Sequence, residues 1–157
     1  MSNQLMRPEL GEFSSIVCFK ALITGMEEAL GEKTAAIALI AAGRKRGKNL
    51  VNQLGLSNTC MPLEELTQKL SQAIGKDGTR LCQIKKIVRD GEAIEVYISE
   101  ALCSAGEMAG STRKCTFTLG AIWGALEQAM NVRLQGIHTE SVLQSGTHDV
   151  FKFTLIS

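Results

Sequence analysis

The hydrophobic residues of this 157-residue chain change their spacing between Gly75 and Leu81. From about Ser14 to Gly75 they recur at every third or fourth position, which is the period of an α-helix. Beyond Leu81 they alternate with polar residues over short runs, as they do in half-buried β-strands. A chain that begins with several helices and continues mainly with paired strands is predicted to form an α+β domain.

Four helices are expected, over residues of about 14–30, 33–54, 62–75 and 115–130. Gly31 and Gly75 are placed to end the first and third of these helices, because glycine accepts the backbone conformations that follow a helix. The third helix is expected to start at Pro62, with Glu64 and Glu65 near the positive end of its dipole.

Two pairs of strands are expected. Asp90-Gly91 lies between two extended runs, which is a strong hairpin signal, and Ile94, Val96 and Ile98 form one buried face of the second run. The last two strands cover residues 132–143 and 148–156, joined at Ser145-Gly146. The predicted order is helix-helix-helix-strand-strand-helix-strand-strand, with an antiparallel sheet of about four strands and the helices packed on one of its faces.

Composition limits the classes of protein to which the chain can belong. Its length fits a single domain over residues 1–157, of which 1–12 are expected to be flexible. The net charge of +1 and the 4% share of aromatic residues argue against a nucleic-acid partner. The apolar runs are too short to span a membrane. Five scattered cysteines, without a CxxC pair or a signal peptide, favour reduced thiols and a cytoplasmic location.

The basic stretch "GRKRGKNL" at residues 43–50 resembles a phosphate-binding loop only superficially. Its spacing is one residue short, and Asn49 stands where the motif needs a hydroxyl. We interpret it as a solvated basic end of a buried helix. The alternative is a contact with an anion or an acidic partner, which would use Arg44, Lys45, Arg46 and Lys48.

The segment "CTFTLGAIWGALEQAM" carries a single charge, Glu127, so nearly every face of this helix should be covered. Gly120 and Gly124 lie one turn apart, and each costs about 1 kcal/mol relative to alanine in a helix. Either the backbone of another helix approaches these glycines or they keep space open for a ligand beside Trp123. The sequence leaves both explanations open.

Catalytic residues do not stand out. The chain has five cysteines and two histidines, but their spacing does not identify a nucleophile and its base. The loop "CSAGEMAGSTRKC" at residues 103–115 fits a lid or an anion-binding nest, but also a plain connection in which Ser111 or Thr112 caps the next helix. Whether the chain is an enzyme stays open, and a non-catalytic protein is favoured.

Several segments of the chain share features with one known family. They are Cys115 before a Gly-xxx-Gly helix, Glu140 in the following strand, and "ALGEKTAAIALIAAGRKRG", "CSAGE" and "TESVLQSGTHDVF". In these segments the chain resembles the 4-vinyl-reductase-type domain family. Within that family, the chain is most similar to small single-domain cyanobacterial hydrocarbon-binding proteins. The resemblance implies the fold of Golgi transport-particle subunits and of bacterial phenol sensors. It also implies a pocket for a small hydrophobic molecule and frequent dimer formation.

The same resemblance bears on metal binding. In the sensor branch of the family, zinc is held by residues that align here with Cys115, Glu140, Leu143 and Phe151. The last two are apolar, and two ligands do not complete a tetrahedral zinc site. His138 and His148 lie off the motif. We therefore expect a degenerate site at Cys115 and Glu140, without zinc.

The resulting hypothesis is a binding domain for a tetrapyrrole, a pigment intermediate or a hydrocarbon chain that supports photosynthetic pigment or photosystem biogenesis. A homodimer, a photosynthetic assembly partner and a position peripheral to the thylakoid membrane belong to this expectation. The alternative is an assembly or scaffold protein with a vestigial pocket; a vinyl reductase is less favoured. The expected ligand-binding residues are Trp123, Ile122, Phe117, Gly120, Gly124, Leu39, Ile40, Arg44 and Arg46.

Overall fold

The computed structural model describes residues 6–157 and has the predicted order of elements. The helices are α1 (Ile16–Leu30), α2 (Glu32–Gln53), α3 (Leu63–Ile74) and α4 (Thr116–Met130). The strands are β1 (Gln83–Asp90), β2 (Ala93–Ser99), β3 (Leu134–Glu140) and β4 (Asp149–Leu155). Two short 3-10 turns, Leu102–Ser104 and Val142–Gln144, precede α4 and β4. The prediction of an α+β fold is confirmed.

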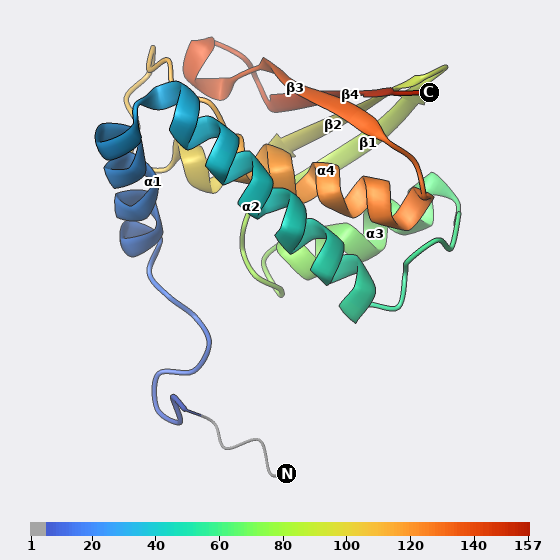
Figure 1. Cartoon of the computed structure of the whole chain (residues 1–157), viewed down its shortest axis with the longest axis horizontal. Coiled ribbons are helices and arrows are strands. Elements are labelled where there is room, and N and C mark those ends of the chain that lie inside the picture. The colour runs from blue at the N-terminus through green and yellow to red at the C-terminus, as the bar shows by residue number, and fades with distance from the viewer. Residues whose placement is uncertain (1–5) are drawn as a thin grey trace.

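The four strands form one antiparallel sheet in the order β1-β2-β4-β3. The helices lie on one face of this sheet, and α4 is sandwiched between the sheet and α2 (Figure 1). Ile94, Val96 and Ile98 of β2 are fully buried, as their alternation predicts. The first hairpin is also confirmed, but its two turn residues are Gly91 and Glu92, since Asp90 already pairs with Ala93.

The ends of the helices follow the predicted signals with small shifts. Gly31 and Gly75 are the C-caps of α1 and α3, and Pro62 is the residue before α3. Ser111 and Thr112 do not cap α4, because Cys115 occupies the N-cap and no side chain bonds there. Part of the segment expected to be flexible, residues 1–5, lies outside the described residues.

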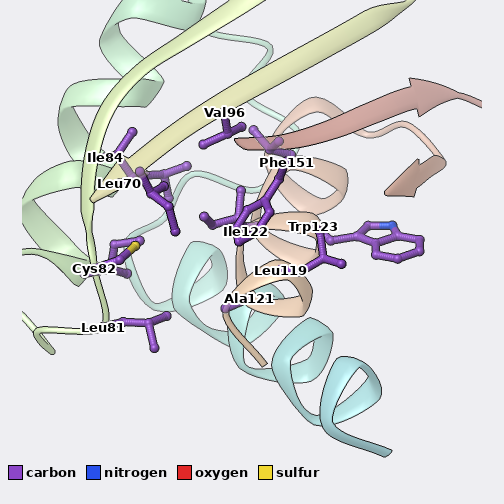
Figure 2. Packing of buried hydrophobic residues seen from close by; sticks show 14 of the residues in the cluster. Leu70, Leu81, Cys82, Ile84, Val96, Leu119, Ala121, Ile122, Trp123 and Phe151 are labelled. Carbon is purple, nitrogen blue, oxygen red and sulfur yellow. The ribbon is translucent and has the colours of Figure 1, made fainter. Parts of the chain in front are cut away.

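One hydrophobic core fills the space between the sheet and α2, α3 and α4. Phe151 and Phe153 of β4 and Leu126 of α4 are completely buried in it, and Figure 2 shows its central residues. A smaller cluster of Ile23, Ala35 and Leu39 joins α1 to α2. Within residues 6–157, no helix combines the length and hydropathy needed to cross a membrane.

Candidate functional site

A cavity of about 800 Å³ opens beside α4, between the N-terminal end of α1, the second half of α2, α3 and the start of β1. Its wall is mostly apolar and is built from segments far apart in the sequence. The lining residues are Glu12, Phe13, Ser14, Ser15, Ile16, Phe19, Arg46, Gly47, Leu50, Leu70, Ile74, Thr79, Arg80, Leu81, Ile84, Leu102, Phe117, Ala121, Ile122 and Ala125.

One face of α4 forms the side of the cavity. Phe117, Ala121 and Ala125 follow one another at intervals of four residues, so their side chains lie on one stripe of the helix. Phe19 of α1 packs edge-to-face against Phe117, with ring centroids 5.1 Å apart. These aromatic and aliphatic groups, together with the concave shape, are typical of a small-molecule site.

Charged groups gather among the lining residues from separate segments. Arg46 comes from α2, Arg80 from the turn after α3, and Glu12 from the segment before α1. Two cationic side chains against one carboxylate leave an excess of positive charge. The cavity is therefore suited to an apolar molecule that carries an anionic group.

Three of the sequence-predicted residues line this cavity: Phe117, Ile122 and Arg46. Leu39 lies instead in the small cluster between α1 and α2, and Ile40 packs against the main core. The Trp123 ring points away from Leu70, Leu81 and Ile84, whereas Ile122 points toward them (Figure 2).

Gly120 and Gly124 lie at the contact between α4 and α2. A Cβ atom at Gly120 would overlap the carbonyl of Ile40, and one at Gly124 would overlap the carbonyl of Arg44. Gly43 and Gly47 on α2 face α4 in the same way, against Phe117, Ala121 and Ala125. Of the two explanations that the sequence left open, the structure therefore shows close packing of two helix backbones at these glycines.

Arg44 is held on the side of α4 where Trp123 lies. Its Nη2 donates to Glu127 Oε1 at 2.7 Å, and its guanidinium stacks 4.6 Å from the centre of the Trp123 ring. Trp123 also meets Phe153 at 6.2 Å between ring centroids. Arg44 and Trp123 thus join α2, α4 and the sheet, while Arg46, two residues later on α2, reaches the cavity.

Several cavity residues were not found by sequence reasoning. They come from the segment before α1 (Phe13), from α1 (Phe19), from α3 (Leu70, Ile74) and from the residues that follow it (Thr79, Arg80, Leu81). The apolar residues among them follow the same pattern as residues packed in a core. Only the arrangement of the helices distinguishes a cavity wall from a filled interior.

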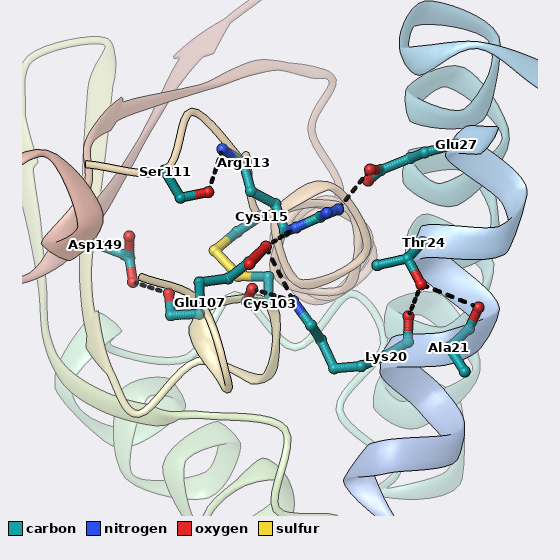
Figure 3. Close-up of polar contacts among 11 residues, drawn as sticks. Lys20, Ala21, Thr24, Glu27, Cys103, Glu107, Ser111, Arg113, Cys115 and Asp149 are labelled. Carbon is teal, nitrogen blue, oxygen red and sulfur yellow. Dashed lines mark hydrogen bonds and ion pairs between the residues drawn. A yellow bond between two sulfur atoms is a disulfide. The ribbon is translucent and has the colours of Figure 1, made fainter. Parts of the chain in front are cut away.

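The two residues of the expected degenerate zinc site differ in burial. Cys115 is buried, whereas Glu140 is exposed and follows a register shift in β3. Leu143 and Phe151 are buried apolar residues. Cys115 forms a disulfide with Cys103, so the expectation of five reduced thiols is wrong for this pair (Figure 3).

A different set of side chains surrounds Cys115. Three potential ligand atoms lie within 4.8 Å of one another, one each from Cys115, His138 and Asp149. No local pattern indicates this group, because its members are separated by 23 and 11 positions. The pairing of β3 with β4 brings His138 close to Asp149, and the start of α4 places Cys115 beside His138.

The thiol of Cys82 is buried close to the cavity residues Leu81 and Ile84. Burial raises the pKa of this thiol to about 12, and the negative charge of Asp149 adds to the effect. Cys18 and Cys60, in contrast, are exposed. The three free thiols should therefore differ in reactivity, since the thiolate is the reactive form.

This difference gives a prediction that also tests the disulfide. Iodoacetamide at neutral pH should modify Cys18 and Cys60 of the folded protein and leave Cys82 unmodified, as counted by mass spectrometry. Unfolding without a reductant should expose Cys82 as a third site. Only reduction should release Cys103 and Cys115. Modification of four or five cysteines without a reductant would contradict the disulfide.

Comparison with solved structures shows that the fold is shared. The chain superposes on the phenol-responsive sensory domain of the transcription activator PoxR, determined with phenol, with a TM-score of 0.71 and 11% sequence identity. The superposition covers 92% of this chain and 76% of that domain. A trafficking protein particle complex subunit 3 from Naegleria fowleri, covalently bound to palmitic acid, gives a TM-score of 0.59 at 15% identity, over 90% and 93% of the two chains.

No family profile and no curated protein matches the sequence. At these low identities the two structures establish the fold alone. The predicted likeness to Golgi transport-particle subunits and phenol sensors is confirmed at the level of the fold, and the 4-vinyl-reductase-type family stays a prediction.

Proposed function

We propose that the chain binds a small apolar molecule with an anionic group in the cavity between α1, α3 and α4. The observation that carries this proposal is the cavity of about 800 Å³, which falls within the range of small-molecule sites. Its apolar wall matches a hydrophobic body, and Arg46 and Arg80 match a negative end. Two of the solved structures with this fold were determined with phenol and with covalently bound palmitic acid, which supports a ligand of this class.

The finer proposal concerns the identity of the ligand. A tetrapyrrole, a pigment intermediate or a long hydrocarbon chain follows from the sequence resemblance to hydrocarbon-binding proteins, with a role in photosynthetic pigment or photosystem biogenesis. Propionate or fatty-acid carboxylates would lie near Arg46. The proposal assigns no catalytic residue: the protein acts by binding its ligand.

Calorimetry with a porphyrin dicarboxylate, palmitate and phenol tests the proposal. At least one probe should bind the folded chain saturably, with one molecule per chain. Thr79 is exposed and lines the cavity, so Thr79→Trp should block entry at little cost to the fold. Thr154→Trp, an equally exposed position on β4 outside the cavity, is the matched control and should bind normally.

Equal binding by Thr79→Trp and Thr154→Trp would place the ligand elsewhere. If none of the three probes binds the folded protein saturably, the scaffold alternative is favoured. That alternative rests on a specific observation: Val17 and Leu22 of α1 and Ile37 of α2 are more than half exposed.

The anionic group can be tested at Arg46. Arg46→Ala should weaken the binding of a carboxylate probe by roughly five-fold at low salt, and the difference should shrink at high salt, because partly exposed ion pairs are screened. Lys45→Ala removes the same charge from the next residue of α2, which is exposed and does not line the cavity. An equal effect of both changes would show a general influence of charge instead of contact at Arg46.

A further inference from the structure

Three buried donor groups of different chemistry meet below the hairpin of β3 and β4. Cys115 is the N-cap of α4, His138 belongs to β3 and Asp149 opens β4. Their potential ligand atoms lie within 4.8 Å of one another. The side chains of His138 and Asp149 are 4% and 1% exposed, and Cys115 is 2% exposed. Burying an imidazole and a carboxylate beside a cysteine sulfur is costly unless these polar groups find partners.

Hydrogen bonds hold these groups in place but do not use all of their hydrogen-bonding capacity. His138 Nε2 lies 3.0 Å from Asp149 Oδ1, and the backbone N–H of Cys115 donates to His138 Nδ1 at 3.4 Å. Asp149 Oδ1 also accepts from the backbone N–H of Val142 at 3.3 Å, and Oδ2 accepts from Ser104 Oγ at 3.4 Å. Most of these bonds are long, while a carboxylate can accept about four hydrogen bonds.

The disulfide decides what Cys115 can do. While Cys115 is bonded to Cys103, its sulfur is not a thiolate and cannot serve as a strong metal ligand. Reduction by a dithiol breaks the S–S bond and yields two thiols, and the dithiol leaves as its own disulfide, so the two electrons balance. The Cα atoms of Cys103 and Cys115 are 5.2 Å apart, so the freed Cys103 thiol stays next to Cys115, whose sulfur lies within 4.8 Å of the ligand atoms of His138 and Asp149.

Ion pairs keep the loop between the two cysteines in place. Arg113 pairs with both Glu107 and Glu27, and Lys20 lies 3.3 Å from Glu107 (Figure 3). Lys20 Nζ also donates to the carbonyl of Cys103 at 2.9 Å. These contacts anchor the loop to α1 from both ends and do not depend on the disulfide. The arrangement of the two sulfurs should therefore survive reduction.

We propose that the reduced protein binds one zinc-like divalent cation through Cys115, His138 and Asp149, with the freed Cys103 thiolate at the fourth position. Binding displaces one proton from each thiol, so the cation and the disulfide are alternative states of one site. A set of two sulfurs, one nitrogen and one oxygen suits Zn²⁺ in tetrahedral geometry. Zinc bonds of about 2.0–2.3 Å require the donors to approach one another by roughly 1 Å.

This site differs from the degenerate one expected from the sequence. Glu140, Leu143 and Phe151 take no part in it, and His138, Asp149 and Cys103 take their places around Cys115. It is also independent of the proposed cavity function, because none of its four residues lines the cavity.

Cobalt(II) is the probe, because it replaces zinc and shows thiolate coordination directly by its absorption. In a Cys18→Ser/Cys60→Ser background, which removes the exposed thiols, protein reduced with a phosphine should bind one Co²⁺ per chain with sulfur-to-metal charge transfer. The oxidised protein should bind none. Elemental analysis after addition of Zn²⁺ to the reduced protein should give one zinc per chain.

Two pairs of variants separate metal binding from loss of stability. Cys103→Ser and Cys115→Ser lose the same disulfide, but only Cys103→Ser keeps the central thiol, so it should bind cobalt without any reductant and Cys115→Ser should not. His138→Ala should weaken binding at least ten-fold, whereas His148→Ala, at the only other histidine of the chain, should not change it. Circular dichroism checks that each protein is folded.

The proposal is overturned if the reduced, folded background protein takes up no cobalt. It is overturned equally if Cys103→Ser and Cys115→Ser bind alike, or if His138→Ala binds as tightly as His148→Ala.

Discussion

Replacing Gly124 by leucine is expected to lower the free energy of unfolding by at least about 3 kcal/mol. The Cβ atom alone would overlap the backbone of Arg44 in α2, and backbone cannot move aside as a flexible side chain can. The two helices must separate, which disturbs the most extensive helix contact of the fold. For a chain of this length, the midpoint of thermal unfolding should fall by roughly 6–12 °C.

Gly25 provides the matched control. It lies inside α1, is exposed, and a Cβ atom there would meet nothing within 4 Å. Gly25→Leu should therefore stabilise the protein by a few tenths to about 1 kcal/mol, because leucine has the higher helix propensity. Opposite signs for one substitution at two helical glycines would show that backbone contact decides the outcome. A similar small effect at both positions would contradict the close packing of α2 on α4.

The glycines also show where sequence reasoning stops. The cost of Gly120 and Gly124 in a helix indicated that something compensates for it, and the structure identifies the second backbone. The partner glycines, Gly43 and Gly47, lie about 80 positions away within a basic stretch whose composition predicts a solvated helix end. A periodic pattern gives the face of a helix that is covered, but it does not name the element that covers it.

The fold was more predictable than the site for the same reason. Periodicity and turn residues are local, so the order of elements and the burial of Ile94, Val96 and Ile98 follow from them. The first hairpin turn moved by one residue because local signals fix the presence of a turn better than its register. The cavity and the group around Cys115 depend on contacts between distant segments, such as the pairing of His138 with Phe151 across β3 and β4.

The position of Trp123 also could not be predicted from a local pattern. A large aromatic residue beside two glycines suggested a pocket wall, but its neighbour Ile122 faces the cavity, and successive residues of a helix point about 100° apart. Trp123 packs instead between Arg44 and Phe153. A shift of one position along α4, from Ile122 to Trp123, therefore changes a residue of the cavity wall into one that packs against the sheet.

Replacing Glu127 by alanine is expected to cost about 3 kcal/mol. This carboxylate, the one charge of α4, is only 8% exposed and joins three elements. Its Oε2 accepts the buried backbone N–H of Leu134 at the start of β3 at 2.9 Å, and its Oε1 accepts from Arg44 of α2. Alanine leaves the N–H of Leu134 without an acceptor, at a cost of about 1–3 kcal/mol. Arg44 is 37% exposed, so its ion pair adds at most about 1 kcal/mol.

Three comparisons locate the origin of this loss. Glu127→Gln keeps an oxygen for the N–H of Leu134 and removes the charge, so it should cost only about 1 kcal/mol. Glu28→Ala, at an exposed position of α1, should stay within about 0.5 kcal/mol of the unchanged protein. A double-mutant cycle of Arg44→Ala with Glu127→Ala, measured by urea unfolding, isolates the ion pair. If Glu127→Gln lowers the free energy of unfolding as much as Glu127→Ala does, the charge of Glu127 holds β3 to α4, and not its role as acceptor for Leu134. The charge is the property that both variants lose.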